Sequence, residues 1–195
     1  MTPERTEKLQ KVLRKRQADM TLVLENVHDP HNISAVMRTC ESVGIQDLFV
    51  LNTRLPTHKK FGERSSSSAL KWLTIHQYDN AEACFGELRK RNFRIYTTWL
   101  GDGSADLYEM DFTTPVAIVF GNEKTGVSDE IRALADGNMV IPQVGIIQSL
   151  NISVACAVTV YEAFRQKRLA GHYEAPRLPE QRYDELWQLW SENRD

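Results

Sequence analysis

Short apolar runs along this chain alternate with segments in which apolar residues recur every three or four positions. The run VAIVF at 116–120 is apolar at every position, as in a strand that is buried on both faces. Helix signals separate such runs: Ser128 can cap a helix, whereas Gly44 and Gly171 can end one. The pattern predicts strands at 21–27, 47–52, 72–76, 93–99, 115–121 and 138–142, with helices at 31–43, 79–92 and 150–168 and another beginning at Ser128. This alternation favours an α/β fold with a mostly parallel sheet and helices on both faces.

Each end of the chain adds an amphipathic helix to this pattern. Thr2 and Pro3 suit the start of a helix over 2–17, whose apolar positions form only a narrow stripe. The last helix has apolar and aromatic residues at helical spacing, and packing on the domain or on a second subunit explains them better than base stacking. These residues are Tyr183, Leu186, Trp187 and Trp190. We therefore divide the chain into an amino-terminal basic helix (1–19), a main domain (20–170) and a carboxyl-terminal helical extension (171–195).

The composition limits the classes of function. The 195 residues include 24 Lys+Arg and 26 Asp+Glu, and a net charge of -2 excludes a uniformly basic nucleic-acid binder. No stretch approaches the roughly 20 apolar residues of a membrane span, so we expect a cytoplasmic protein without a membrane partner. Cys40, Cys84 and Cys156 are odd in number and far apart, which argues against a disulfide framework or a zinc site.

Two segments are nevertheless locally basic. One is the amino-terminal helix, and the other is the loop 54–68, which also contains four consecutive serines. Basic side chains on such segments can contact the phosphates of a nucleic acid, but each segment could equally be ordinary solvated surface. The candidate RNA-binding residues are Lys11, Arg14, Lys15, Arg54, Lys59, Lys60 and Arg64.

The common nucleotide-binding fingerprints are missing, since no GxGxxG follows the first strand and no GxxxxGKS occurs. Glycines instead follow three later strands, and each alone marks only a turn. They are Gly101, Gly103, Gly121, Gly126 and Gly145. Because the carboxyl ends of parallel strands meet at one edge of a sheet, these turns together predict a pocket floored by backbone groups.

Three short segments carry a more specific signal. They read HNISAVMR at 31–38, VFGNEKTG at 119–126, and IP at 141–142 followed by SLNISVA at 149–155. In this order they resemble the three motifs of the SPOUT class of RNA methyltransferases, in particular the TrmH-like branch that methylates ribose 2′-hydroxyls. The resemblance spans about residues 20–168. It implies a deep trefoil knot in the carboxyl-terminal part of the domain, a homodimer, and S-adenosylmethionine as the cofactor.

The resemblance also implies site residues. The catalytic set would be Asn32, Arg38, Glu123, Ser149 and Asn151, and the cofactor-binding set would be Thr98, Leu100, Gly121, Ile141 and Leu150. The family proposal makes Arg38 a general base, but a guanidinium with a pKa above ~12 is a poor base, so we favour an anchor for the phosphate beside the target ribose. Glu123 could orient Arg38 or the ribose, or it could be a solvated turn residue. Ser149 and Asn151 could do no more than cap the long helix.

The function that follows is S-adenosylmethionine-dependent 2′-O-methylation of tRNA at the D-loop guanosine 18. The chain resembles enzymes with this target because it has short helices at both ends and no separate amino-terminal RNA-binding domain. The alternatives are a methyltransferase for the tRNA wobble ribose or ribosomal RNA, and a catalytically silent RNA-binding dimer. We expect tRNA and a second copy as partners, and neither DNA nor a metal, since His28 and His31 lack further ligands nearby.

The long helix at 150–168 predicts how two copies would meet. Its apolar residues point in nearly every direction around the helix axis. One face can pack on the sheet, and another face then needs a second subunit to cover it.

Overall fold

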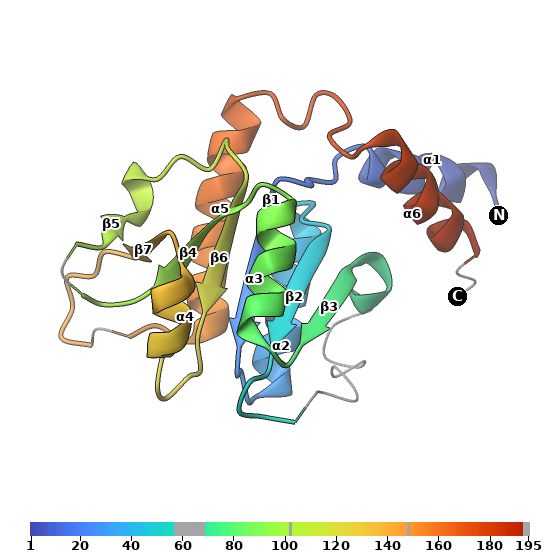
Figure 1. Cartoon of the computed structure of the whole chain (residues 1–195). Coiled ribbons are helices and arrows are strands. Elements are labelled where there is room, and N and C mark those ends of the chain that lie inside the picture. The colour runs from blue at the N-terminus through green and yellow to red at the C-terminus, as the bar shows by residue number, and fades with distance from the viewer. Residues whose placement is uncertain (57–68, 102, 148, 193–195) are drawn as a thin grey trace.

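Figure 1 shows the computed structural model of the protein, which describes residues 1–56, 69–101, 103–147 and 149–192. A seven-stranded sheet has the order β3-β2-β1-β6-β4-β7-β5, and every neighbouring pair is parallel. The strands are β1 (Met20–Glu25), β2 (Asp47–Leu51), β3 (Thr74–Tyr78), β4 (Arg94–Thr98), β5 (Ala105–Asp106), β6 (Val116–Phe120) and β7 (Gly137–Val140). The helices are α1 (Pro3–Leu13), α2 (Pro30–Ser42), α3 (Ala81–Lys90), α4 (Asp129–Leu134), α5 (Ile152–Leu169) and α6 (Glu180–Glu192), with short 3-10 turns η1 (Ala69–Trp72) and η2 (Leu107–Glu109). The predicted α/β class with a parallel sheet is confirmed.

Helices cover both faces of the sheet, because successive side chains of a central strand point to opposite sides. On β1, Leu22 and Leu24 belong to a core shared with α2 and α5. Val23 belongs to a second core, shared with α3 and α4. Figure 1 shows α3 and α4 in front of the sheet and α2 and α5 behind it. The carboxyl ends of the central strands are therefore enclosed between the two helix layers.

The two ends of the chain meet in a third, smaller core. Leu13 of α1 and Trp190 of α6 are both buried there, so the carboxyl-terminal rings serve packing, as their spacing predicts. Arg16 follows α1 and is fully buried, with its guanidinium carbon 4.9 Å from the ring centre of Trp190. The same guanidinium donates to the carbonyl groups of Glu41 and Ile45. These contacts fasten α1 and α6 to the carboxyl end of α2.

Several element boundaries differ from the sequence prediction. The first helix ends at Leu13 instead of residue 17, because Gln17 leaves the helix and donates its backbone N–H to the carbonyl of Gly44 at 2.8 Å. The helix predicted from residue 79 begins at Ala81, because Asn80 is its cap. The side chain of Asn80 accepts the N–H of Ala83 at 2.8 Å. The strand expected at 72–76 starts two residues later, as β3. The strand β5 is too short to show a periodicity in the sequence.

Within the described ranges, no helix has the length and apolar content needed to cross a membrane. In the same ranges, no group of three or more His, Cys, Asp or Glu side chains is arranged to hold a metal ion.

Candidate functional site

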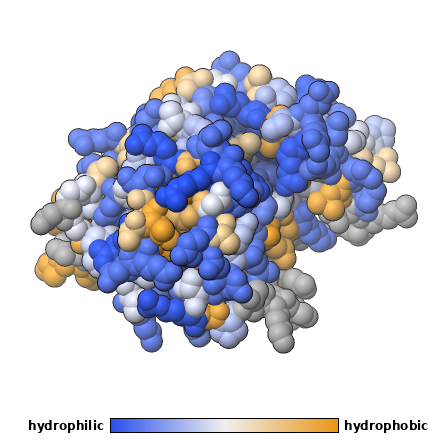
Figure 2. Space-filling view, in the orientation of Figure 1, coloured by the Kyte–Doolittle hydropathy of each residue, from blue (hydrophilic) through white to orange (hydrophobic). Residues whose placement is uncertain are grey.

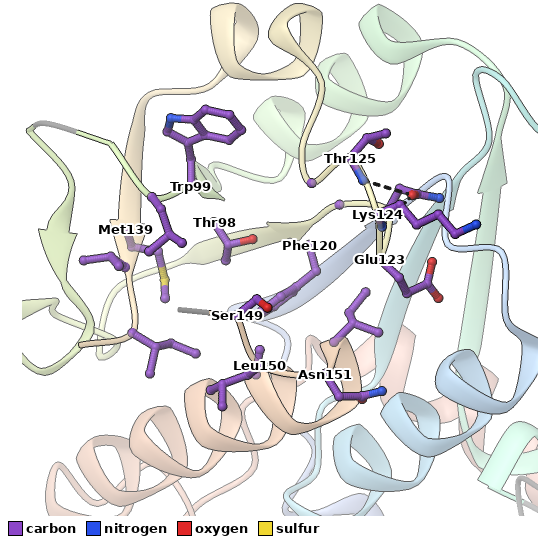
Figure 3. A pocket seen from close by; sticks show the side chains of 18 of the residues that line it. Thr98, Trp99, Phe120, Glu123, Lys124, Thr125, Met139, Ser149, Leu150 and Asn151 are labelled. Atoms are coloured by element: carbon purple, nitrogen blue, oxygen red, sulfur yellow. Dashed lines mark hydrogen bonds between the residues drawn. The ribbon is translucent and has the colours of Figure 1, made fainter. Parts of the chain in front are cut away.

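A cavity of about 610 Å³ lies at the carboxyl ends of β4, β6 and β7, beside the start of α5 (Figure 3). This is the edge of the sheet at which the glycine turns predict a pocket. One part of its lining is apolar, with Leu100, Phe120, Met139, Ile141 and Leu150. The other part is polar, with Asn122, Glu123, Lys124, Thr125, Ser149 and Asn151. All five residues predicted to bind the cofactor, namely Thr98, Leu100, Gly121, Ile141 and Leu150, line this cavity.

The floor of the cavity is the turn that follows β6. Asn122 and Gly126 exchange two backbone hydrogen bonds, of 3.1 and 2.9 Å, so the chain folds back on itself directly after the strand. Gly121 is required by this close approach, because a Cβ there would lie 2.2 Å from the carbonyl carbon of Gly126. The side-chain amide of Asn122 donates to the carbonyl of Asn26 at 2.8 Å and ties the turn to the end of β1.

A polar network joins this turn to the helices α2 and α5. The carboxylate of Glu123 accepts hydrogen bonds from the backbone N–H groups of His28 (3.3 Å) and Asp29 (3.4 Å) and from the side-chain amide of Asn32 (3.1 Å). The side-chain oxygen of Asn32 accepts in turn from the amide of Asn151 at 3.3 Å. Asn151 also caps α5 through the N–H of Ser153, at 2.8 Å. The network therefore sets the relative positions of the turn and both helix starts.

The surroundings of Glu123 favour its ionised form. Partial removal from water alone would raise the pKa of this carboxyl group. The hydrogen bonds from the Asn32 side chain and from the backbone of His28 and Asp29 outweigh that effect, and the pKa lies below its ordinary value. Glu123 is therefore a carboxylate at neutral pH and places a negative charge at the polar end of the cavity.

Four of the five predicted catalytic residues come together here. Glu123, Ser149 and Asn151 line the cavity, and Asn32 is hydrogen-bonded to two of these three. Arg38 is exposed on α2 and does not line the cavity, and its side chain forms no hydrogen bond or ion pair with another described residue. The contact of Glu123 with Arg38 that the sequence leaves open is therefore not formed, and Glu123 binds Asn32 and the start of α2 instead.

The sequence analysis assigned no role to several other lining residues, among them Trp99 and Lys124. Trp99 lies between the predicted positions Thr98 and Leu100, and an aromatic ring in the last position of a predicted strand was the available signal. Lys124 lies inside the second motif segment, directly after Glu123. It is exposed and forms no ion pair with a described acidic residue.

The predicted RNA-binding residues that the structure describes lie outside the cavity. Lys11 is exposed on α1, Arg14 and Lys15 are exposed directly after it, and Arg54 is exposed just after β2. Lys59, Lys60 and Arg64 lie outside the described residues.

Known proteins share both the sequence and the fold. A sequence profile of the SpoU rRNA methylase family matches residues 19–161, which is most of the chain. The chain belongs to the SpoU rRNA methylase family. A protein from Thermus thermophilus, named tRNA (guanosine(18)-2′-O)-methyltransferase, is 44% identical over 97% of this chain and 96% of its own length. A relative of the same name from Escherichia coli K12 is 38% identical over 92% of this chain and 79% of its own length.

Solved structures of SpoU relatives agree in architecture. The crystal structure of the Aquifex aeolicus TrmH/SpoU tRNA modifying enzyme matches with a TM-score of 0.89 at 38% identity, over 96% of this chain and 95% of that chain. The SpoU methyltransferase AviRb from Streptomyces viridochromogenes, solved in complex with the cofactor AdoMet, matches with a TM-score of 0.71 at 26% identity. That match covers 81% of this chain and 62% of AviRb.

Proposed function

We propose that this protein is an S-adenosylmethionine-dependent methyltransferase that modifies the ribose 2′-hydroxyl of guanosine 18 in the D-loop of tRNA. The observation that carries the proposal is the network of Asn32, Glu123 and Asn151 at the edge of the cavity. Similarity over nearly the whole chain to relatives named tRNA (guanosine(18)-2′-O)-methyltransferase supports this target. We place the enzyme in the cytoplasm and expect no DNA partner.

The cavity fits this cofactor in size and in chemistry. Its volume of about 610 Å³ lies within the range of about 300–1,000 Å³ that is usual for small-molecule sites. Met139 and Leu150 belong to an apolar side that suits an adenine ring, and the carboxylate of Glu123, at the other side in Figure 3, favours a cationic ligand group. When bound, S-adenosylmethionine supplies a methyl group that is activated by the positive charge on its sulfur.

The chain's own residues must align the ribose hydroxyl for an in-line displacement and help it lose its proton. We assign Ser149 and Asn151 to the orientation of the cofactor and the incoming ribose, since both line the cavity on the α5 side. Glu123 and Asn32 hold the start of α2 against the turn, which keeps Asn151 in place. Arg38 would bind the phosphate beside the target ribose, because a guanidinium is a cation that donates hydrogen bonds and accepts none.

We further propose a homodimer that is formed around α5 and the segment before it. Val154 and Tyr161 of α5 are 48% and 52% exposed, and Val144, Ile146 and Ile147 are each at least 76% exposed. In Figure 2, apolar side chains gather at the left edge of the molecule, where Figure 1 places the segment between β7 and α5. An apolar surface of this kind usually marks an interface, and a two-fold pairing makes it self-complementary. Sedimentation that shows a stable, active monomer at low micromolar concentration would overturn this proposal.

The proposal retains two further expectations about the chain. One is the deep trefoil knot in the carboxyl-terminal part of the domain; the insertion of β7 between β4 and β5 is compatible with it. The other is the division into 1–19, 20–170 and 171–195. A crystal structure traced from β6 to the end of α5 tests the knot, and an unthreaded chain there would contradict it.

We also propose that the exposed basic residues at the end of α1 and directly after it, together with the segment 54–68, bind tRNA. Neutralising Lys11, Arg14 and Lys15 together should weaken tRNA binding and reduce its salt dependence, by about one unit of logarithmic slope for each lost phosphate contact. Lys90→Ala, which removes an exposed charge from α3, is the matched control. Unchanged binding of the triple variant would leave α1 as a solvated face.

The decisive experiment is methylation of transcript tRNA with labelled S-adenosylmethionine, followed by mapping of the modified nucleotide. Label at guanosine 18 supports the proposal. Label at the wobble ribose, or only on ribosomal RNA, would replace the target by one of the two enzymatic alternatives. Binding of tRNA without methyl transfer would indicate a catalytically silent RNA-binding dimer.

A further inference from the structure

Trp99 follows β4 directly and lines the cavity, yet the mechanism above gives it no part. Its backbone is already in use. The N–H donates to the carbonyl of Met139 at 3.3 Å, and the carbonyl accepts from the side-chain amide of Asn138 at 2.9 Å. A bound ligand would have to displace these hydrogen bonds to reach the backbone of Trp99, so the indole ring is the part of Trp99 that can contact a ligand.

The indole is held in place from outside the cavity. The guanidinium carbon of Arg132, on α4, lies 3.9 Å from the ring centre, which is a close cation–π contact. Arg132 is itself tethered by an ion pair with Asp129 in the first turn of the same helix. Gly126, in the turn after β6, faces the ring edge, since a Cβ added there would lie 3.8 Å from Cζ3 of Trp99. Trp99 as a whole nevertheless stays 36% exposed, and Figure 3 shows its indole at the edge of the cavity, beside Thr98.

We propose that Trp99 is a wall of the cofactor pocket that contacts the adenosyl group, and that Arg132 is the positioning residue that holds the indole there. This inference rests on the proposed use of S-adenosylmethionine. An adenine ring stacks on or packs against aromatic side chains through its π-face. The two sequence neighbours of Trp99, Thr98 and Leu100, line the same cavity, and Figure 3 shows the indole above Thr98 at the edge of the cavity.

Arg132 contributes by reducing the freedom of the indole before the cofactor binds. A tryptophan side chain at the end of a strand has several rotamers, and the guanidinium on one face selects one of them. A side chain that is ordered in advance loses less entropy on binding. Loss of Arg132 should therefore weaken cofactor affinity although Arg132 itself does not line the cavity.

Cofactor affinity and tryptophan fluorescence test both parts of the inference. Trp99→Ala should raise the calorimetric Kd for S-adenosylmethionine by about fivefold to a hundredfold, the range of one lost stacking contact, with Trp99→Phe between it and the wild type. Arg132→Met should raise the same Kd by about 2- to 30-fold, which is the range of a cation–π contact. Arg132→Lys should retain part of the affinity that Arg132→Met loses, because a lysine can still place a cation over the ring. The matched control is Arg94→Met, which removes a cation–π partner of Tyr96 on the same strand and away from the cavity.

Fluorescence gives a signal that a merely structural role would not produce. The other three tryptophans, Trp72, Trp187 and Trp190, lie in the core between α1 and α6. Titration with S-adenosylmethionine should change the tryptophan emission of the wild type and of Trp187→Phe, but not the emission of Trp99→Phe. The thermal midpoint of Trp99→Phe should stay near that of the wild type.

Two outcomes would overturn the inference. One is a Kd for S-adenosylmethionine within about twofold of the wild type in both Trp99 variants. The other is a cofactor-dependent change in emission that persists in Trp99→Phe. Either result in an enzyme that still methylates tRNA refutes this inference alone, whereas a wild type that binds the cofactor but methylates no tRNA refutes the proposed function alone.

Discussion

Replacing Glu123 by Gln tests whether the network between the turn after β6 and α2 supports catalysis. The substitution keeps the size of the side chain and removes its charge. One carboxylate oxygen accepts from the N–H of His28, and the other accepts from Asp29 and Asn32. A glutamine has a single acceptor oxygen. Either the N–H of His28 or the two donors from Asp29 and Asn32 must therefore face its NH₂ group, which is itself a donor and cannot accept their hydrogen bonds.

The expected size of the effect follows from the geometry. Hydrogen bonds to a charged group contribute about 1.5–3 kcal/mol each when they are well formed and buried. The bonds to Glu123 are 3.1 to 3.4 Å long and lie at an exposed position, so we expect their combined weakening to cost about 1 kcal/mol. If the network orders Asn32 and Asn151 in the transition state, the single-turnover rate falls by about fivefold.

The assay is single-turnover methylation at saturating tRNA and cofactor, with the Kd for S-adenosylmethionine measured separately. Glu82→Gln, an exposed acid in the first turn of α3, is the control and should behave as the wild type. Asn32→Ala and the double variant complete a double-mutant cycle. The loss of single-turnover rate in the double variant, expressed as free energy, should be clearly smaller than the sum of the two single losses. A single-turnover rate within twofold of the wild type for Glu123→Gln, or full additivity in the cycle, would refute the reasoning.

Three further predictions concern other parts of the molecule. Burial alone would raise the pKa of Asp47, but its hydrogen bond and ion pair with His76 lead the effects that lower it. The ionised Asp47 therefore stabilises the fold fully above the unfolded pKa of about 4, and this stabilisation is lost as the pH falls through the lower folded pKa. Asp47→Asn should lower the free energy of unfolding at pH 7, and in acid denaturation its difference from the wild type should shrink below about pH 4. Gly44→Ala should lower the free energy of unfolding by about 2 kcal/mol in urea titration, because φ is +86° and the new Cβ would lie 2.6 Å from the carbonyl oxygen of Lys15; a loss below about 0.5 kcal/mol would contradict this. Arg38→Ala should leave the Kd for S-adenosylmethionine nearly unchanged and reduce the single-turnover rate by more than about tenfold, and a smaller reduction would remove Arg38 from the site.

Local patterns in the sequence were enough to predict most of the fold. The apolar run of β6 and the cap at Ser128 act within a few residues of themselves, and the structure confirms both. The site residues were predicted from the resemblance of three short segments to family motifs, and one of these segments forms a tight turn closed by Asn122 and Gly126. The position of the cavity followed from the parallel sheet, which brings the carboxyl ends of its strands to one edge.

Only the tertiary structure decided which polar groups meet. Glu123 and Asn32 are 91 positions apart, and their hydrogen bond exists because β1 and β6 are neighbours in the sheet. Arg16 and Lys167 are charged residues that the structure buries, and Lys167 forms an ion pair with Asp19 at 2.7 Å across 148 positions. The physical reason is that a buried charged group needs a partner that compensates for its loss of hydration. In both cases a distant segment supplies that partner, and the local pattern of apolar residues cannot predict which segment it is.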